Sequence, residues 1–293
     1  MKDRDILHRF LFEQFPVRGK LVHLDASWQA VLERHDYPPA VREVLGEAMA
    51  ATAMLAATLK FDGKLTLQMQ GSGPLSLVLV QCSSELALRG LARWRADVPP
   101  GNLAQMTGGG RLSVTIEMAD QRRYQGIVPL DGAGIAECLQ AYFAQSEQMP
   151  TRVWLTADDQ RAVGMMLQKL PAELGGEEGD ADGWPRVSML AETLTDQELL
   201  RLEDETLLRR LFCEEDVRLF AGLPVSFRCS CTRNKVESVL RMLGRDEISG
   251  VIEEKGSVEV CCEFCNKPYT FDPIDVERLF RDGETSPGSR TLH

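Results

Sequence analysis

The sequence has no apolar segment long enough to cross a membrane. Its best candidate, AMAATAMLAATL at 48–59, is alanine-rich, follows Arg42, Glu43 and Glu47, and falls short of the roughly 20 residues that a spanning helix needs. The N-terminus MKDRDILHRF alternates charged with apolar residues and lacks the uncharged core of a signal peptide. We therefore expect a buried helix at 48–59, no membrane partner and a cytoplasmic protein.

Positive charge is scarce in the second part of the chain. The net charge is −11, from 33 Lys and Arg against 44 Asp and Glu. Residues 1–171 carry 18 of each sign, residues 172–228 carry 6 positive and 14 negative, and residues 229–293 carry 9 positive and 12 negative. Proteins that bind phosphate backbones need a positive surface, so this distribution argues against a nucleic-acid partner.

The first 171 residues have the pattern of a mixed α/β (α+β) core domain with an antiparallel-rich sheet. Residues 38–60 have helical length and prolines at their start. From Leu65 onwards apolar residues recur at every second position, through the GSGP turn and again at 112–118, which predicts strands with one buried face. A further helix is expected near 133–146.

The composition then changes to PAELGGEEGDADGWP, 171–185, with five acidic residues, no basic ones and four glycines, which predicts a flexible boundary. Thr195 with Glu198 predicts a capping box ahead of a leucine stripe at helical spacing. The stripe fits an ordinary docked helix pair, or a conditional pair that stays folded only while its neighbours hold it. We assign 172–228 to an acidic, amphipathic helical linker and expect a frayed tail at 281–293.

Five of the eight cysteines fall between 229 and 265, as CSC and CCEFC. The cytoplasm keeps thiols reduced, so such clusters are more often metal sites than disulfides. Four thiolates from two clusters can close a tetrahedral zinc site, and metal binding then folds a segment too small to hold itself together well. The spacing consists of CxC, then thirty residues, then CxxC. It favours a zinc site over the two alternatives, which are chance clustering of cysteines and disulfides alone.

The segment between the clusters supports a small metal-bound domain. NKVESVLRML, closed by Gly244, and DEISGVIEEKG predict two short helices, and VEV predicts a strand that leads into the knuckle. The remaining cysteines, Cys82, Cys138 and Cys213, stand alone and are expected to be small buried hydrophobes.

Further motifs run along the whole chain: HDYP (35–38), ATLKFDGKLTLQMQGSGP (57–74), RGLAR (89–93), RYQGIVPL (123–130) and YFAQSEQMPTR (142–152). With CSC and CEFC they resemble the heat shock protein 33 family of redox-regulated holdase chaperones, essentially end to end. The resemblance implies an inactive, zinc-locked reduced state and an oxidised state that binds unfolding client proteins without ATP. It implies no enzymatic activity, a homodimer when oxidised, and client binding and dimerisation through residues 1–171.

The resemblance also implies the site residues, all within a zinc-binding redox-switch domain at 229–293. Carried over by motif, the ligands of one zinc ion per reduced chain are Cys229, Cys231, Cys262 and Cys265. The implied disulfides of the oxidised state are Cys229–Cys231 and Cys262–Cys265.

The chain departs from the family pattern at two positions. Asn266 stands where zinc knuckles commonly place glycine, but Asn tolerates the left-handed conformation needed there. Cys261 is an extra cysteine. If VEVCC is a strand, adjacent side chains face opposite sides, so Cys262 aimed at the metal sends Cys261 away from it. Cys261 is then either a small apolar residue or a thiol that competes for Cys265 once the metal leaves.

Two other classes of protein share part of this pattern. A zinc-ribbon nucleic-acid binder should show a basic patch with interleaved aromatics, whereas residues 229–293 have net charge −3, one Tyr and three Phe. A thiol-disulfide oxidoreductase usually places CxxC at the start of a helix, whereas CEFC follows a strand and precedes PYTF. His8, His23 and His35 lie near no nucleophile motif and are expected to have surface or structural roles.

Overall fold

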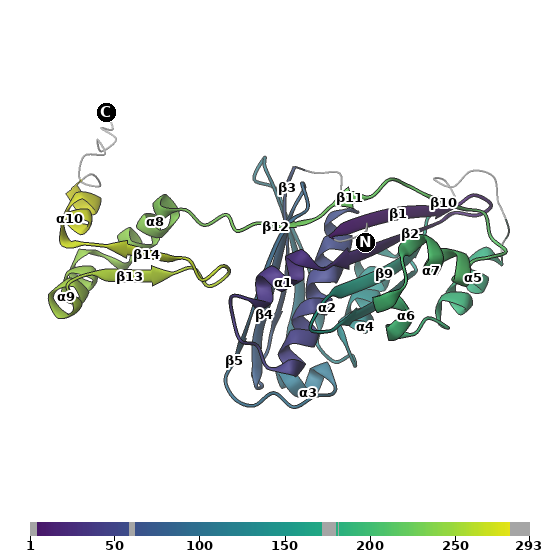
Figure 1. Ribbon diagram of the computed structural model, residues 1–293, viewed down its shortest axis with the longest axis horizontal. Helices are drawn as coiled ribbons and strands as arrows, with labels where there is room; N and C mark the ends of the chain where they lie inside the picture. The colour runs from purple at the N-terminus through teal and green to yellow at the C-terminus, as the bar shows by residue number, and fades with distance from the viewer. Residues whose placement is uncertain (1–4, 59–61, 172–179, 181, 282–293) are drawn as a thin grey trace, which may run out of the picture. The chain divides into compact units, whose positions relative to one another are not determined.

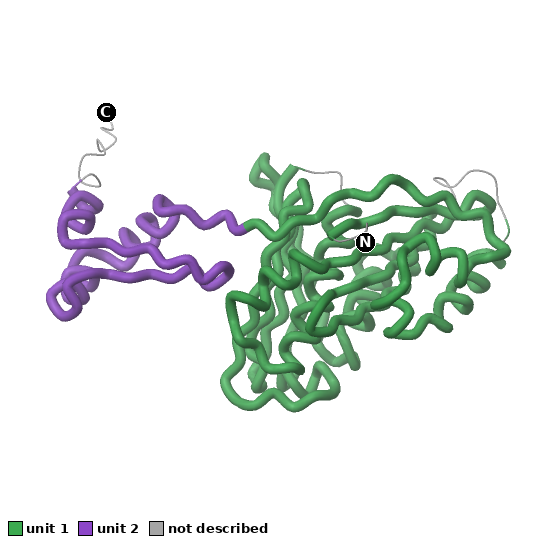
Figure 2. The backbone as a smooth tube through the Cα atoms, in the orientation of Figure 1, with its two compact units in different colours: residues 1–228 green, residues 229–293 purple. Residues whose placement is uncertain are grey.

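The computed structural model describes residues 5–58, 62–171, 180 and 182–281 (Figure 1). The tail from residue 282 onwards and most of the acidic, glycine-rich boundary lie outside the described residues. The chain divides into two compact units, residues 1–228 and 229–293, shown in green and purple in Figure 2. The mixed α/β architecture with antiparallel sheets is confirmed. A separate core and linker, divided near residue 171, stays a prediction, because both lie within the first unit.

Two six-stranded sheets build the first unit. Sheet A has the order β10-β1-β2-β9-β8, with β11 also paired to β1, and all its pairings are antiparallel. Its strands are β1 (Ile6–Phe12), β2 (Val17–Leu24), β8 (Thr151–Ala157), β9 (Ala162–Lys169), β10 (Val217–Leu219) and β11 (Leu223–Pro224).

Sheet B has the order β12-β5-β4-β3-β6-β7 and is antiparallel except that β12 runs parallel to β5. Its strands are β3 (Gly63–Gln70), β4 (Leu75–Ser83), β5 (Ala87–Trp94), β6 (Arg111–Met118), β7 (Arg123–Pro129) and β12 (Ser226–Phe227). The strands predicted from period-two apolar residues are therefore confirmed as β3, β4 and β6. In β4 the predicted buried face of Leu75, Leu77 and Leu79 is wrong beyond Leu75, because an irregularity between Leu75 and Leu77 shifts the register and buries Val78, Val80 and Cys82 instead.

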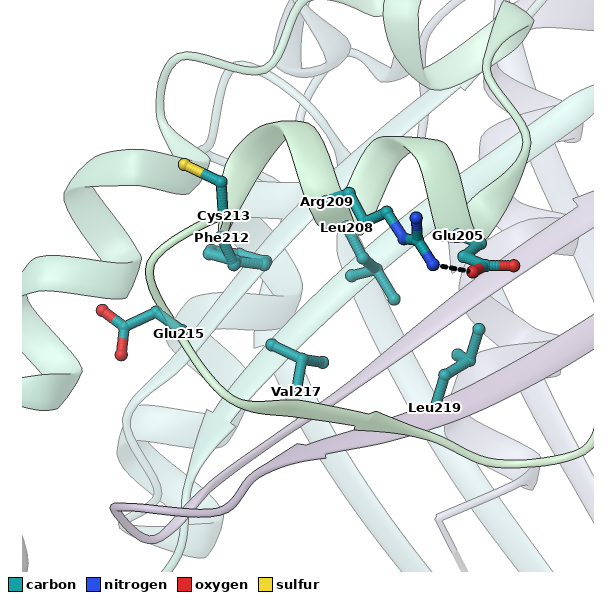
Figure 3. A pocket seen from close by; sticks show the side chains of 8 residues that line it. All are labelled: Glu205, Leu208, Arg209, Phe212, Cys213, Glu215, Val217 and Leu219. Carbon is teal, nitrogen blue, oxygen red and sulfur yellow. Dashed lines mark hydrogen bonds and ion pairs between the residues drawn. The ribbon is translucent and has the colours of Figure 1, made fainter.

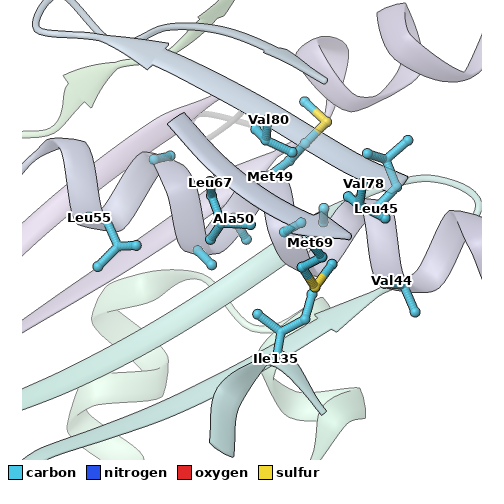
Figure 4. Close-up of a cluster of buried hydrophobic side chains, with 14 of the residues drawn as sticks. Val44, Leu45, Met49, Ala50, Leu55, Leu67, Met69, Val78, Val80 and Ile135 are labelled. Carbon is cyan, nitrogen blue, oxygen red and sulfur yellow. The ribbon is translucent and has the colours of Figure 1, made fainter. Parts of the chain in front are cut away.

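Helix α2 (Pro39–Ala56) packs against strands of both sheets and is buried along most of its length (Figure 4). Its small side chains let the strands approach closely: a Cβ on Gly46 would stand 2.4 Å from the Cβ of Ala157. The predicted buried helix is thus confirmed as far as Ala56. The other helical segments of this core are α1 (Ala26–Leu32), α3 (Leu103–Thr107), α4 (Ile135–Tyr142) and the π-helical turn η1 (Phe143–Glu147).

Three helices of the predicted linker cover the face of sheet A that points away from α2: α5 (Gly183–Ala191), α6 (Asp196–Arg201) and α7 (Asp204–Leu211). Strand β9 shows the two faces, since Met166 belongs to the α2 cluster while Val163 and Met165 pack with the linker helices. The predicted capping box is confirmed, with the N–H of Glu198 donating to Oγ1 of Thr195 at 3.3 Å.

After α7 the linker runs along the edges of both sheets. Strands β10 and β11 pair with β1, and β12 pairs with β5. Without these three short strands, β1 would be the edge of sheet A and β5 the edge of sheet B. The linker therefore covers one apolar face and two strand edges.

The second unit is built on the hairpin of β13 (Val258–Cys261) and β14 (Pro268–Phe271), with helices α8 (Arg233–Leu243), α9 (Arg245–Lys255) and α10 (Pro273–Arg281). The two predicted helices are confirmed as α8 and α9, which end at Gly244 and Gly256 with φ of 95° and 75°. Up to residue 281, where the described part of this unit ends, its buried apolar core has seven residues: Leu240, Ile248, Val258, Tyr269, Phe271, Val276 and Leu279. Across the described parts of both units, no helix has the length and apolar character to cross a membrane.

Candidate metal centre

Four cysteine side chains from two parts of the chain meet beside the β13–β14 turn. Cys229 and Cys231 precede α8, whereas Cys262 and Cys265 lie in the turn. All four Sγ atoms lie within 4.8 Å of one another. The sulfurs of Cys229 and Cys262 are 3.6 Å apart, and those of Cys231 and Cys265 are 3.4 Å apart. The described residues contain no other group of three or more His, Cys, Asp or Glu with ligand atoms this close.

Backbone hydrogen bonds shape the turn into a knuckle. The N–H of Asn266 donates to the carbonyl of Cys262 at 2.7 Å, and the N–H of Cys262 donates to the carbonyl of Lys267 at 3.0 Å. The backbone N–H groups of Phe264 and Cys265 donate to the sulfur of Cys262. Asn266 has a φ of 54°, the left-handed conformation that Asn tolerates. The CxxC motif thus lies between two strands and does not begin a helix.

The donor set and its spacing fit a zinc ion. Four thiolates at about 2.3 Å from a tetrahedral zinc stand about 3.8 Å apart, close to the 3.4 and 3.6 Å of the nearest sulfur pairs. As thiols, both residues of the turn resist ionisation, because burial raises the pKa of Cys262 and raises that of Cys265 to about 12. A cation among the sulfurs acts in the opposite direction, since it stabilises each thiolate. The four cysteines can therefore hold a metal ion, and soft sulfur ligands are compatible with zinc.

Tyr269 lines the centre from β14. Its hydroxyl donates a hydrogen bond to Sγ of Cys231 at 3.2 Å, and its ring is buried in the small core. This hydrogen bond, followed by burial, raises the pKa of Tyr269 to about 12. The cysteine motif did not single out this residue. The alternation of β14, which buries Tyr269 and Phe271 and exposes Thr270, is the signal that could have found it.

Cys261 lies outside the group of four. It is the last residue of β13, it is exposed, and its sulfur is 3.8 Å from Oε1 of Glu259. The neighbouring Cys262 is partly buried and takes part in the cluster. The exposed thiol of Cys261 is therefore more accessible to dissolved reagents than the partly buried sulfurs of the cluster.

The three isolated cysteines differ in exposure: two are buried and one is exposed. Cys82 and Cys138 are buried as expected, and burial raises the pKa of both thiols, that of Cys82 to about 12. The expectation for Cys213 is wrong, because this residue is exposed. Helix α7 ends at Leu211, and Phe212 takes the buried position that follows, which leaves Cys213 beyond the helix end.

Comparison with known proteins agrees with this architecture. The family described as Hsp33 protein matches residues 5–272, which include all four clustered cysteines. The chain is 51% identical over 293 residues to the 33 kDa chaperonin of Nitrosococcus oceani and 46% identical over 295 residues to that of Methylobacillus flagellatus, with 100% of each chain covered. Its fold is similar to the crystal structure of the 33 kDa chaperonin (heat shock protein 33 homolog) of Thermotoga maritima, with a TM-score of 0.82, 25% identity, and coverage of 96% of this chain and 99% of that one.

Proposed function

Because this chain belongs to the Hsp33 family, we propose that it is a redox-regulated, ATP-independent holdase, inactive while reduced and metal-bound and active once its thiols are oxidised. It is a chaperone of that family and not an enzyme. One observation carries the redox part of the proposal. The four clustered sulfurs lie within 4.8 Å of one another, in a unit whose core, over the described residues 229–281, has seven buried apolar residues.

We assign one zinc ion per reduced chain to four ligands: Cys229, Cys231, Cys262 and Cys265. When bound, zinc supplies a cross-link between the two cysteine segments and keeps their sulfurs ionised. The chain itself orients the ligands, through the knuckle around Cys262 and the hydroxyl of Tyr269 on Cys231. A core this small is not expected to hold the unit together without that cross-link.

Oxidation is proposed to convert the four thiolates into the disulfides Cys229–Cys231 and Cys262–Cys265. With peroxide as oxidant, one thiolate of each pair attacks an oxygen, the O–O bond breaks, and hydroxide leaves a sulfenic acid behind. The second thiolate then attacks that sulfur and displaces its oxygen as a second hydroxide. Each pair thus gives up two electrons, and its sulfurs no longer offer thiolate ligands to the metal.

The pairing matters for the outcome, because the nearest sulfurs belong to different segments. Disulfides Cys229–Cys262 and Cys231–Cys265 would replace the metal with covalent ties between the same two segments and keep the unit closed. Disulfides within each segment leave the two segments free to separate. Unfolding on oxidation therefore requires the local pairs, and peptide mapping of the oxidised chain distinguishes the two arrangements.

The linker is the part that we expect oxidation to release. Only Arg228 stands between the end of β12 and the first ligand, Cys229. Release would open the edges of β1 and β5 and uncover the apolar face of sheet A. The core residues of that face are Phe10, Phe12, Leu21, Val163, Met165 and Leu167. An apolar face beside open strand edges suits the extended, apolar segments of an unfolding protein.

The linker packs incompletely where α7 faces β10 (Figure 3). A pocket of about 430 Å³ lies there, lined by apolar side chains of α7 and β10 together with the exposed pair Glu205–Arg209. The pocket is partly open to solvent, so the side chains along it lack packing partners on one side, and the boundary of the helix layer there opens at lower free energy than the core. This favours a conditional helix layer over a permanently docked one.

The remaining parts of the proposal concern partners and compartment. We propose unfolding proteins as clients and a homodimer as the oxidised form. The net charge of −11 does not suit nucleic acid. A centre of four reduced thiols requires a reducing compartment, which points to the cytoplasm.

The test is to measure zinc content and suppression of aggregation on the same full-length sample before and after peroxide. We expect one zinc and little suppression before, and metal loss with strong suppression after, without ATP. The exposed Cys213 offers a matched control, since Cys213→Ser should keep both responses. Equal suppression by the reduced form would refute the switch, and turnover in an insulin-reduction assay would favour an oxidoreductase instead.

A further inference from the structure

A buried charged cluster joins the linker to sheet A at the start of α7. Asp204, the first residue of α7, is 1% exposed. Its Oδ2 lies 2.6 Å from Nδ1 of His8 on β1, and its Oδ1 lies 2.7 Å from Nε2 of His23 on β2. The latter two atoms make no hydrogen bond of regular geometry with any described residue, so theirs is a close polar contact, whereas His8 and Asp204 are hydrogen-bonded. Each oxygen of one linker carboxylate is therefore held by a different strand of the core.

The surroundings of this cluster are apolar. His8 lies opposite Leu21 in the β1–β2 ladder, on the face of sheet A that the linker covers, and α7 packs there through Leu207, Leu208 and Leu211. A buried carboxylate is costly unless it is paired, and apolar side chains in its place are often at least as stable. Compared with an apolar contact of the same size, the cluster therefore adds little net stability, but loss of one partner leaves the others buried without compensation, so docking depends on all three.

We propose that Asp204, His8 and His23 form a latch that holds α7 on sheet A, and that opening the latch releases the linker while the metal centre stays intact. Linker release then has a second control that does not involve the thiols. The latch itself follows from the contacts, whereas its effect on client binding rests on the proposed function.

His8 also meets the linker at a second point. Gly222, between β10 and β11, lies so close that a Cβ there would stand 2.7 Å from Nε2 of His8 and 2.4 Å from Cγ2 of Ile6. The backbone of Gly222 is not left-handed, so the glycine is needed for space and not for its conformation. A methyl group at position 222 would clash with both Ile6 and the His8 ring, and we expect the shift of that ring to weaken its contact with Asp204.

The experiment compares Asp204→Ala with Asp196→Ala in the full-length, reduced, metal-loaded protein. Asp196 is the matched control, because it is also the first residue of a linker helix but is exposed. Hydrogen exchange of the α7 amides should become about ten- to a hundredfold faster in Asp204→Ala, since the two imidazoles lose a charged partner, and should stay as in wild type in Asp196→Ala. One metal per chain and unchanged protection of β3 and β6 should show that the rest of the protein is folded.

Gly222→Ala provides an independent variant that leaves all three latch residues in place. It should also release α7, and both variants should suppress aggregation without oxidant. Wild-type protection of α7 in both variants would overturn the latch, as would loss of protection that extends through β3 and β6 in both. If α7 is released but neither the variants nor the oxidised wild type suppress aggregation, the latch stands and the proposed function fails.

Discussion

The sulfur of Cys231 lies 3.2 Å from the hydroxyl oxygen of Tyr269, which follows the last of the four clustered cysteines in the sequence. A hydroxyl that donates to a thiolate withdraws electron density from it and makes it a weaker nucleophile. Tyr269→Phe should therefore keep the metal but undergo oxidation by peroxide roughly threefold faster. The rate of thiol loss under limiting peroxide measures this, with Tyr124→Phe as control because Tyr124 is 53% exposed. Unchanged kinetics would mean that this hydrogen bond does not tune the centre.

Serine variants of the adjacent Cys261 and Cys262 should show which of the two residues is a metal ligand. Cys262→Ser removes a member of the sulfur cluster, so we expect metal affinity to fall by about a hundredfold or more and some suppression of aggregation without oxidant. Cys261→Ser should keep one metal per chain, since this exposed sulfur lies outside the cluster. Elemental analysis and a competing chelator measure both. Metal lost in the Cys261 variant and kept in the Cys262 variant would reverse the assignment.

A chain that ends at Leu170 should fold and should bind unfolding proteins without oxidation. Apart from Val225, the described residues that are buried in the large apolar cluster around α2 all come from positions up to Met166. Loss of the linker would expose the apolar side chains of sheet A that now pack under α5 and α7. Near-ultraviolet circular dichroism and an aggregation assay test this. A molten spectrum would show that the linker is an integral part of the core.

The contact between α7 of the linker and sheet A should weaken in acid, at a pH set by the pKa of Asp204. Burial alone raises the pKa of this carboxyl, but the close contacts with His23 and His8 outweigh burial and hold the pKa below the ordinary 3.8. A group whose pKa is lower in the folded state stabilises the fold above its unfolded pKa, and that contribution is lost as pH falls through the folded value. Protection of α7 should therefore decline below about pH 4, and this step should be absent in Asp204→Asn.

The measurement is hydrogen exchange of α7 corrected for the intrinsic pH dependence of exchange. Other ion pairs near α7 include Glu205–Arg209, Glu198–Arg210 and Arg186–Glu215, and Asp204→Asn leaves all three unchanged. The substitution also leaves the four cysteines of the second unit unchanged. An identical acid profile in wild type and Asp204→Asn would contradict the assignment of this step to Asp204.

The parts of this molecule that sequence could predict are those with local signatures. The spacing within CSC and CEFC, the capping box at Thr195 and the glycines that end α8 and α9 all act over a few residues, and the structure contains each of these helices and the cysteine cluster. Strands β10, β11 and β12 have two or three residues, too few for a period of two to show. Their pairing depends on distant partners.

Polar contacts between residues far apart in the chain could not be predicted from the sequence either. Asp204 has the sequence context of an ordinary first-turn helix residue, and His8 lies 196 positions away on a strand. Nothing in either neighbourhood predicts their contact, because it arises only when α7 docks. The error at Cys213 has a related cause. Apolar periodicity does not fix the residue at which a helix ends, and one position decides whether that thiol is covered or exposed.

The short strands of the linker determine the order in which it can peel from the core. If unfolding enters at Cys229, it first meets β12, which is held by the N–H groups of Ser226 and Arg228 at 3.1 and 3.0 Å from their carbonyl acceptors on the β5 side. It then meets β11, β10 and finally α7 with its buried carboxylate. Each of these steps breaks only a few hydrogen bonds, and a broken strand pairing can re-form before the next strand is released. Under the proposed function, a brief oxidation would therefore be expected to release only the strands next to Cys229, and sustained oxidation would be needed to release the helices, so the linker would respond to the duration of the stress.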